Sequence, residues 1–226
     1  MKEILEYLEQ LAANNNRVWF NDNKSRYQDI QHKVSRIAGD LIDGISAFEP
    51  GASALTPADC LYRIYRDTRF RADKTPYKTH IGIYINPFGG KKSQLGGYYL
   101  HLEPGSCLVG GGIWCPTPPV LKALRQAIYD NVDEYLEIIH NPDFARVFTE
   151  VGDDLLKTAP KGFPKDWEHI DLIRPRSYTV LSPLDNRTVI SGKLIAEVLR
   201  RFEMMKPFND FLNYTFEENP SLPKYY

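Results

Sequence analysis

The sequence predicts an α+β protein in which a central, mainly antiparallel sheet is flanked by N-terminal and C-terminal helices. Both ends of the chain carry hydrophobic residues at every third or fourth position, which is the spacing of an amphipathic helix. In the middle of the chain the spacing changes to alternation, in short segments separated by glycine and proline. We expect residues 1–226 to fold as a single globular domain, because the chain shows neither an internal repeat nor a low-complexity linker.

Two helices are predicted before the sheet. Residues 4–12 carry one hydrophobic stripe, and the asparagines at 14–16 end it. A stronger stripe runs from Tyr27 to Phe48, with charged residues between the hydrophobic ones. Pro50 is expected to end this second helix, because proline cannot continue a helical turn.

The central part predicts a sheet of three or four strands, over residues 61–66, 80–86, 97–103 and 107–114. The loop chemistry of residues 87–92 indicates that the second and third strands pair as a hairpin. The last strand contains Gly110-Gly111-Gly112. Such a run suits either a backbone that approaches a ligand or a strand that another element crosses closely.

Helices return after the sheet. Thr117 and Pro118 have the order of an N-cap and a first helical residue, and three hydrophobic stripes follow up to Val151. Residues 157–181 are rich in proline and predict an irregular segment. A long helix is expected after Ser191, and we expect Pro207 to interrupt it, because proline lacks the amide hydrogen that an inner helical turn needs.

Composition excludes several classes of protein. Lys and Arg number 28 against 29 Asp and Glu, and the resulting charge of -1 excludes a polycationic nucleic-acid coat and an acidic solvating protein. No apolar stretch reaches the roughly 20 residues of a membrane helix, so no membrane partner is expected. The first residues are too charged for a secretory signal, and the 3 cysteines lack C-x-x-C spacing. We therefore expect a cytoplasmic protein with reduced thiols and no cofactor.

The near-neutral charge conceals one strongly basic segment. Residues 63–80, called the basic loop below, hold six basic against two acidic residues, whereas residues 129–154 hold eight acidic residues against one arginine. Guanidinium groups bind phosphate and carboxylate through paired donors, so we predict a small phosphorylated or carboxylated ligand here. The alternative is that Asp67 and Asp73 pair with these cations inside the loop. The predicted ligand-binding residues are Arg63, Arg66, Arg69, Lys74, Lys78 and His80.

Two other functions fit the same segment. Aromatic side chains that can stack on bases lie among the cations, at Tyr62, Tyr65, Phe70 and Tyr77, which makes a nucleic-acid-binding module the second hypothesis. We rank it below the small ligand, because the chain has neither a basic tail nor a recognised nucleic-acid motif. The third hypothesis is an interaction scaffold without catalysis, and the sequence leaves the oligomeric state open.

Two histidines and a carboxylate are candidates for chemistry. His101 and Glu103 share one face of a predicted strand, and His80 lies on the strand expected to pair with it. If the protein is an enzyme, these three are the candidate catalytic residues, with a histidine as acid or base. The same set can ligate a metal. Because the sequence does not fix the register and contains no H-E-x-x-H helix, we predict hydrogen-bonded histidines and no metal.

Five blocks of the sequence form a distinctive ordered set: Asn14–Phe20 with Asn23-Lys24, residues 63–80, Gly97–Gly105, Gly110–Trp114, and Pro160–Phe163 followed by Asp171–Arg174. Together they resemble one known family, the conserved hypothetical family called domain of unknown function 2461. They cover the chain to about residue 180, and Val18 stands where the family usually has glutamate. The resemblance implies a full-length member of an uncharacterised soluble family, and it brings no established activity, cofactor or catalytic residue.

Overall fold

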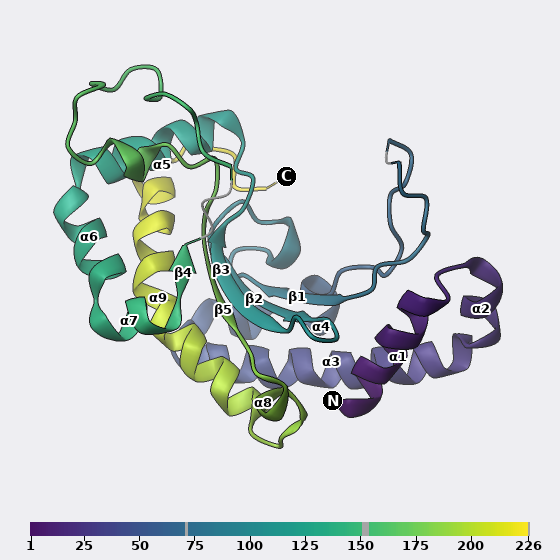
Figure 1. The fold of residues 1–226 in the computed structure, drawn as a ribbon. Coiled ribbons are helices and arrows are strands. Elements are labelled where there is room, and N and C mark those ends of the chain that lie inside the picture. Colours follow the sequence, from purple (N-terminus) through teal and green to yellow (C-terminus); the bar gives the residue numbers. More distant parts are fainter. Residues whose placement is uncertain (71, 151–153, 226) are drawn as a thin grey trace.

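The computed structural model describes residues 1–70, 72–150 and 154–225. Its sheet has the strand order β1-β2-β3-β5-β4, and every neighbouring pair is antiparallel (Figure 1). The strands are β1 (Ile81–Ile85), β2 (Gly97–Leu102), β3 (Leu108–Ile113), β4 (Thr149–Glu150) and β5 (Tyr178–Pro183). The predicted α+β class with a central antiparallel sheet is confirmed, as is the hairpin of β1 and β2.

Helices lie before β1 and after β3 along the chain, where the sequence predicts them. Those before it are α1 (Lys2–Ala13), α2 (Arg17–Asp22), α3 (Lys24–Ser46) and α4 (Pro57–Cys60). Those that follow β3 are α5 (Pro118–Asp130), α6 (Val132–His140), α7 (Pro142–Val147), α8 (Asn186–Ile190) and α9 (Leu194–Glu218). Short 3-10 turns occupy Pro50–Ala54, Gly90–Lys92 and Ile170–Ile173. Within the described ranges, no helix combines the length and the apolar character needed to cross a membrane.

The two faces of the sheet differ in burial. Ile83, Leu100 and Val109 lie side by side across three strands and are fully buried. In Figure 1, α3 and α9 lie below and to the left of the sheet, on the side of this core. The opposite face, called the outer face below, carries Tyr99 and His101, whose side chains are half-buried. The buried hydrophobic residues form one core, and the single domain stays a prediction.

Helix α9 crosses β3 closely, and the glycine run of β3 makes this possible. A Cβ atom at Gly111 would collide with the sulfur of Met205, and one at Gly112 would lie 3.0 Å from the Phe208 ring. The buried Asn209 side chain completes the contact: its Oδ1 accepts from the Gly112 N–H at 3.0 Å, and its Nδ2 donates to the Gly97 carbonyl at 3.1 Å. The close crossing by α9 therefore accounts for Gly111, and the nearness of both α9 and β5 accounts for Gly112.

Some strands and helices differ from the prediction. Residues 61–66 form only isolated bridges, Leu61 to Ile83 and Tyr65 to Tyr77, because the chain turns away from the sheet into the basic loop. β5 lies at the end of the segment predicted to be irregular, where prolines on both sides obscure its alternation of buried and half-buried residues. The third helix after the sheet ends earlier than expected and β4 follows it; Val151 lies outside the described residues.

The prediction that Pro207 interrupts the last helix is wrong. Helix α9 continues through this residue from Leu194 to Glu218, and Figure 1 shows it bending instead. Phe202 and Phe208, on either side of the proline, are almost completely buried. Their packing outweighs the roughly 3 kcal/mol that a proline costs inside a helix, so the helix bends rather than ends.

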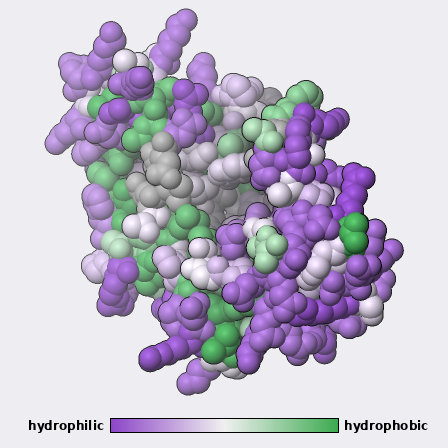
Figure 2. Space-filling view, turned by 45° about the vertical axis from the view of Figure 1, so that its right-hand side comes forward, coloured by the Kyte–Doolittle hydropathy of each residue, from purple (hydrophilic) through white to green (hydrophobic). Residues whose placement is uncertain are grey.

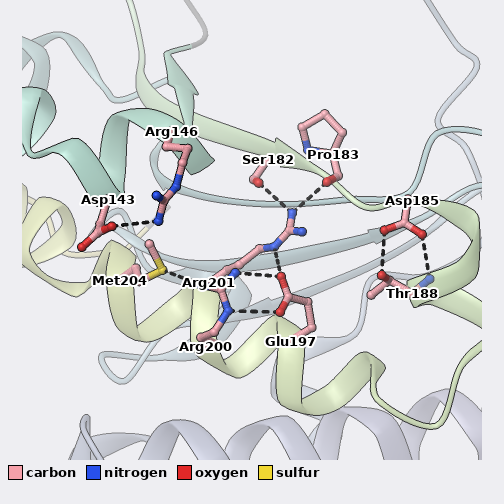
Figure 3. Close-up of polar contacts among 10 residues, drawn as sticks. All are labelled: Asp143, Arg146, Ser182, Pro183, Asp185, Thr188, Glu197, Arg200, Arg201 and Met204. Atoms are coloured by element: carbon pink, nitrogen blue, oxygen red, sulfur yellow. Dashed lines mark hydrogen bonds and ion pairs between the residues drawn. The ribbon is translucent and has the colours of Figure 1, made fainter.

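An arginine ties the first half of α9 to the end of β5 (Figure 3). The Arg201 guanidinium donates to the Ser182 hydroxyl and to the Pro183 carbonyl, both at 2.7 Å. It also donates to Glu197 at 2.8 Å, and Arg200 donates to the same carboxylate at 2.9 and 3.1 Å. Because Arg201 is only 14% exposed, solvent screens this network weakly.

This network predicts a loss of stability in acid. Hydrogen bonds from Arg200 and then Arg201 lower the pKa of Glu197 to about 2, so folding favours its ionised form. The contribution of the Glu197 carboxylate to the free energy of unfolding is complete when the pH is above its unfolded-state pKa of about 4.3. It disappears as the pH falls toward the pKa of the folded state. We expect Glu197→Gln to lower the free energy of unfolding by about 1–2 kcal/mol at neutral pH. Urea denaturation at several pH values should show this difference shrinking below about pH 4.3.

Asp143 supplies the matched control for Glu197. It pairs with Arg146 at 2.8 Å in the same region (Figure 3), but both side chains are more than two thirds exposed, at 73% and 75%. Water and salt screen such a pair, so Asp143→Asn should change the free energy of unfolding by less than about 1 kcal/mol. Equal losses in the two variants would contradict the role given to the Glu197 network.

Candidate functional site

Hydrogen bonds and ring stacking hold the two ends of the basic loop in place. The Lys78 N–H donates to the Ile64 carbonyl at 2.8 Å, which joins the two ends of the loop. Asn15 holds the backbone of Tyr77 from the other side, donating to its carbonyl at 2.9 Å and accepting from its N–H at 3.1 Å. The rings of Tyr77 and Phe20 stack with centres 4.0 Å apart. The loop is therefore anchored to α2 and to the asparagine run before it.

Three of the predicted ligand-binding residues have partners inside the loop. Arg66 donates to Asp73 at 2.6 Å. Arg69 donates to both oxygens of Asp67, at 3.0 and 2.7 Å, and these bonds lower the pKa of the Asp67 carboxyl. Lys74 donates to backbone carbonyls of the loop. The alternative prediction, that aspartates of the basic loop pair with its cations, therefore holds for Arg66 and Arg69.

Arg63 and Lys78 have a different environment. Neither forms an ion pair with any residue of the described ranges. The Lys78 ammonium is half-buried and lies 5.3 Å from the centre of the Tyr62 ring. Burial lowers the pKa of Lys78, and the positive charge of Arg63 lowers it further. Arg71, which belongs to the same basic run, lies outside the described residues.

Two histidines and a glutamate meet on the outer face of the sheet. We call His80, His101 and Glu103 the histidine cluster. Ile81 pairs with Leu102, so one further step of the same register places His80 opposite Glu103. The two imidazole rings stack with centres 4.6 Å apart. One nitrogen of each ring and one carboxylate oxygen all lie within 4.8 Å of one another.

Hydrogen bonds orient the groups of this cluster. His101 Nε2 lies 3.1 Å from Glu103 Oε2, and because an ionised carboxylate only accepts, Nε2 is the donor. The other ring nitrogen, Nδ1, lies 2.8 Å from the Tyr99 hydroxyl, which donates to it when the ring is neutral. The Thr79 hydroxyl donates to Glu103 Oε1 at 3.1 Å. Burial raises the pKa of Tyr99 to about 12, so its proton stays on the phenol.

Burial and neighbouring charges also shift the pKa values of His80 and Glu103. Burial lowers the pKa of His80; positive charge on His101 and Lys78 acts in the same direction, and the negative charge of Glu103 opposes it without reversing the shift. For Glu103, burial raises the pKa, but the hydrogen bonds from His101 and Thr79 together outweigh that effect and leave the pKa lowered. At neutral pH the cluster therefore holds a neutral His80 next to an anionic Glu103.

The basic loop and the histidine cluster share one region of the outer face. A Cβ atom at Gly82 would lie 2.9 Å from the Tyr99 hydroxyl and 3.3 Å from the Tyr62 ring, so both phenols lie over β1. The Lys78 ammonium lies over that same Tyr62 ring. Figure 2 shows the molecule with the right-hand side of Figure 1 turned toward the viewer. In this view the right half of the surface is mainly hydrophilic, and the middle of the visible surface is hollowed.

The structure gathers some of the predicted site residues and separates others. His80, His101 and Glu103 come together, whereas Arg66 and Arg69 face their own aspartates. Two hollows, of about 290 and 260 Å³, are lined by residues other than the predicted ligand-binding ones. Sequence analysis did not assign a role to Tyr99. Tyr99 lies two residues before His101 and so on the same face of the predicted strand, and this spacing could have indicated a contact between the two side chains.

The fold and site define an α+β protein with a polar cluster on the outer face of an antiparallel sheet. The chain belongs to the family described as conserved hypothetical protein (DUF2461), whose model matches residues 3–211. The resemblance found in the sequence is thus confirmed, and the match extends beyond residue 180 into α9. Searches of curated proteins and of solved structures gave no match. The family description carries no reaction.

Proposed function

We propose that this protein binds a small phosphorylated or carboxylated ligand beside Lys78, with Arg63 and His80 as further contacts. The observation that carries the proposal is the Lys78 ammonium, half-buried and without a carboxylate partner in the described part of the chain. Burying an uncompensated charge is unfavourable, and a bound anion would offset that cost. A phosphate or carboxylate group is the simplest such anion.

Two arginines of the basic loop have a supporting role in this proposal. Arg66 and Arg69 hold the shape of the loop through their internal hydrogen bonds and add to the positive potential around it. For a reaction at the bound ligand, we propose His80 or His101 as the acid–base group. Glu103 would orient His101, since it already accepts from its Nε2.

Single-stranded nucleic acid is the second candidate, because aromatic rings of the basic loop face solvent. Phe70 is 95% exposed, and the Arg69 guanidinium lies 5.9 Å from the centre of its ring. Tyr65 is 53% exposed. Exposed aromatic rings among arginines are the means by which proteins stack on bases while attracting the phosphate backbone. A nucleic acid would therefore engage the tip of the loop rather than Lys78.

Thermal denaturation in the presence of anions tests the proposal. The panel contains inorganic phosphate, phosphorylated and carboxylated metabolites, and a single-stranded oligonucleotide. A ligand at a hundredfold excess over its Kd should raise the free energy of unfolding by about 2.7 kcal/mol, which is a shift of several degrees in Tm. Lys78→Ala removes one charged hydrogen bond and should raise the Kd of a small anion roughly tenfold or more.

Lys74→Ala is the matched control, since Lys74 lies in the same loop and donates only to backbone carbonyls. It should leave the Kd within about twofold, because a screened surface charge contributes little. Equal weakening by Lys74→Ala and Lys78→Ala would contradict a site at Lys78. Binding of the oligonucleotide alone, lost in Phe70→Ala and steeply weakened by salt, would replace the small ligand with nucleic acid.

A further inference from the structure

The histidine cluster has the composition and spacing of a metal site. Its two imidazole nitrogens and one carboxylate oxygen lie within 4.8 Å of one another. A tetrahedral ion with bonds of about 2.1 Å would hold its ligand atoms about 3.4 Å apart. His101 Nε2 and Glu103 Oε2 are 3.1 Å apart, close to that spacing, and a nitrogen of the His80 ring lies within 4.8 Å of the other ligand atoms.

The second contacts of these side chains are those that metal ligands need. The Tyr99 hydroxyl lies against Nδ1 of His101, and the Thr79 hydroxyl holds Oε1 of Glu103, so Nε2 and Oε2 face the same point. When an ion binds Nε2, the ring proton moves to Nδ1 and the Tyr99 hydroxyl changes from donor to acceptor. His101 Nδ1 thereby keeps the Tyr99 hydroxyl as its partner. Such contacts fix the tautomer and orientation of ligating histidines.

The backbone positions of the cluster also suit a metal. His101 lies within β2, and His80 and Glu103 directly flank the paired ends of β1 and β2, so the main chain presents all three from a rigid hairpin. The His101 side chain is 15% exposed and that of Glu103 is 34% exposed. The site is therefore shielded from bulk water while an ion can still enter from the outer face.

We propose that His80, His101 and Glu103 bind one divalent first-row transition metal ion, preferentially zinc. Imidazole nitrogens favour such ions over magnesium and calcium, which take oxygen ligands. Three protein ligands leave a coordination position open, the arrangement found in catalytic rather than structural zinc sites. This site goes beyond the proposed binding of an anion and does not depend on it, because the ion alone is the probe. In the metal-bound form, the ligating nitrogens of His80 and His101 would not be available for acid–base chemistry.

Zinc titration of the metal-stripped full chain in competition with a chromophoric chelator tests the site. We expect one ion per chain. Loss of a contact that only supports a metal ligand raises the Kd about 10–100-fold. We therefore expect an increase in the Kd for zinc of at least that size in each of three variants, His80→Ala, His101→Ala and Glu103→Gln. Cobalt bound at the same site should give visible absorption bands typical of a tetrahedral ion. Magnesium should not compete at equal concentration.

His140→Ala is the matched control, because His140 ends α6 and is not part of the cluster. It should leave the zinc affinity unchanged. Circular dichroism melts establish that each variant is folded, and if His101→Ala is not, His80→Gln and Glu103→Gln decide the question. The proposal is overturned if zinc does not bind saturably, if these variants bind it as tightly as the parent chain, or if magnesium binds more tightly.

Discussion

Gly112→Ala is expected to cause the largest loss of stability of any substitution proposed for this chain. Gly112 has a φ of 95°, which an L side chain rarely adopts, and an added Cβ would collide with the carbonyl oxygen of Tyr178 on the neighbouring strand. The same atom would lie 3.0 Å from the Phe208 ring of α9. Backbone cannot yield as the end of a flexible side chain can. We expect a loss above about 4 kcal/mol, measured by circular dichroism melts and by the yield of soluble chain.

Gly105→Ala is the control that shows the cost of backbone strain without a steric collision. Gly105 also has a positive φ, of 78°, but nothing lies within 4 Å of the position where its Cβ would be. The substitution should therefore cost only the conformational strain, about 1–2 kcal/mol. If Gly105→Ala and Gly112→Ala destabilise the chain equally, collision with Tyr178 and Phe208 is not what demands glycine at 112.

Asn209→Leu is expected to produce the second largest loss. Asn209 is 1% exposed, and its amide pairs with the Gly112 N–H and the Gly97 carbonyl. Leucine has the same number of side-chain heavy atoms, similarly branched, but leaves both backbone groups buried without these partners. Each unsatisfied group costs about 1–3 kcal/mol, so urea denaturation should show a loss of about 3–5 kcal/mol.

Asn219→Ala is the control for Asn209→Leu. Asn219 is the C-cap of the same helix, its side chain donates to the Thr215 carbonyl at 2.9 Å, and the residue is exposed. Water can replace that hydrogen bond, so the loss should stay below about 1 kcal/mol. Comparable losses at the two positions would show that the Asn209 amide does not hold α9 to the sheet.

The sequence predicts those elements whose periodicity is undisturbed. Helix α3 and strands β1 and β2 follow their hydrophobic patterns closely, because each buries one face against the core. The pattern fails where tertiary contacts decide. β5 follows a proline-rich segment, carries a proline at its end, and gains its place by pairing with β3. α9 keeps its helical form at Pro207 because the residues around it are buried on the sheet.

The site is predictable in its parts and not in its arrangement. Strand alternation places His101 and Glu103 on one face, but the hairpin register that brings His80 to them is a product of the folded chain. Nor does the sequence tell which cations are neutralised. Arg66 and Arg69 pair with aspartates a few residues away, whereas Lys78 does not, and this depends on how the loop turns.

The pairing of β3 with β5 has a consequence for the order of folding. The hairpin of β1 and β2 and its partner β3 are contiguous in sequence, but β5 follows only after the long segment 114–177. During synthesis, β3 therefore presents an unpaired edge until β5 leaves the ribosome, and such edges invite association with other chains. Closing so long a loop is slow, so we expect docking of β5 to limit the rate of refolding.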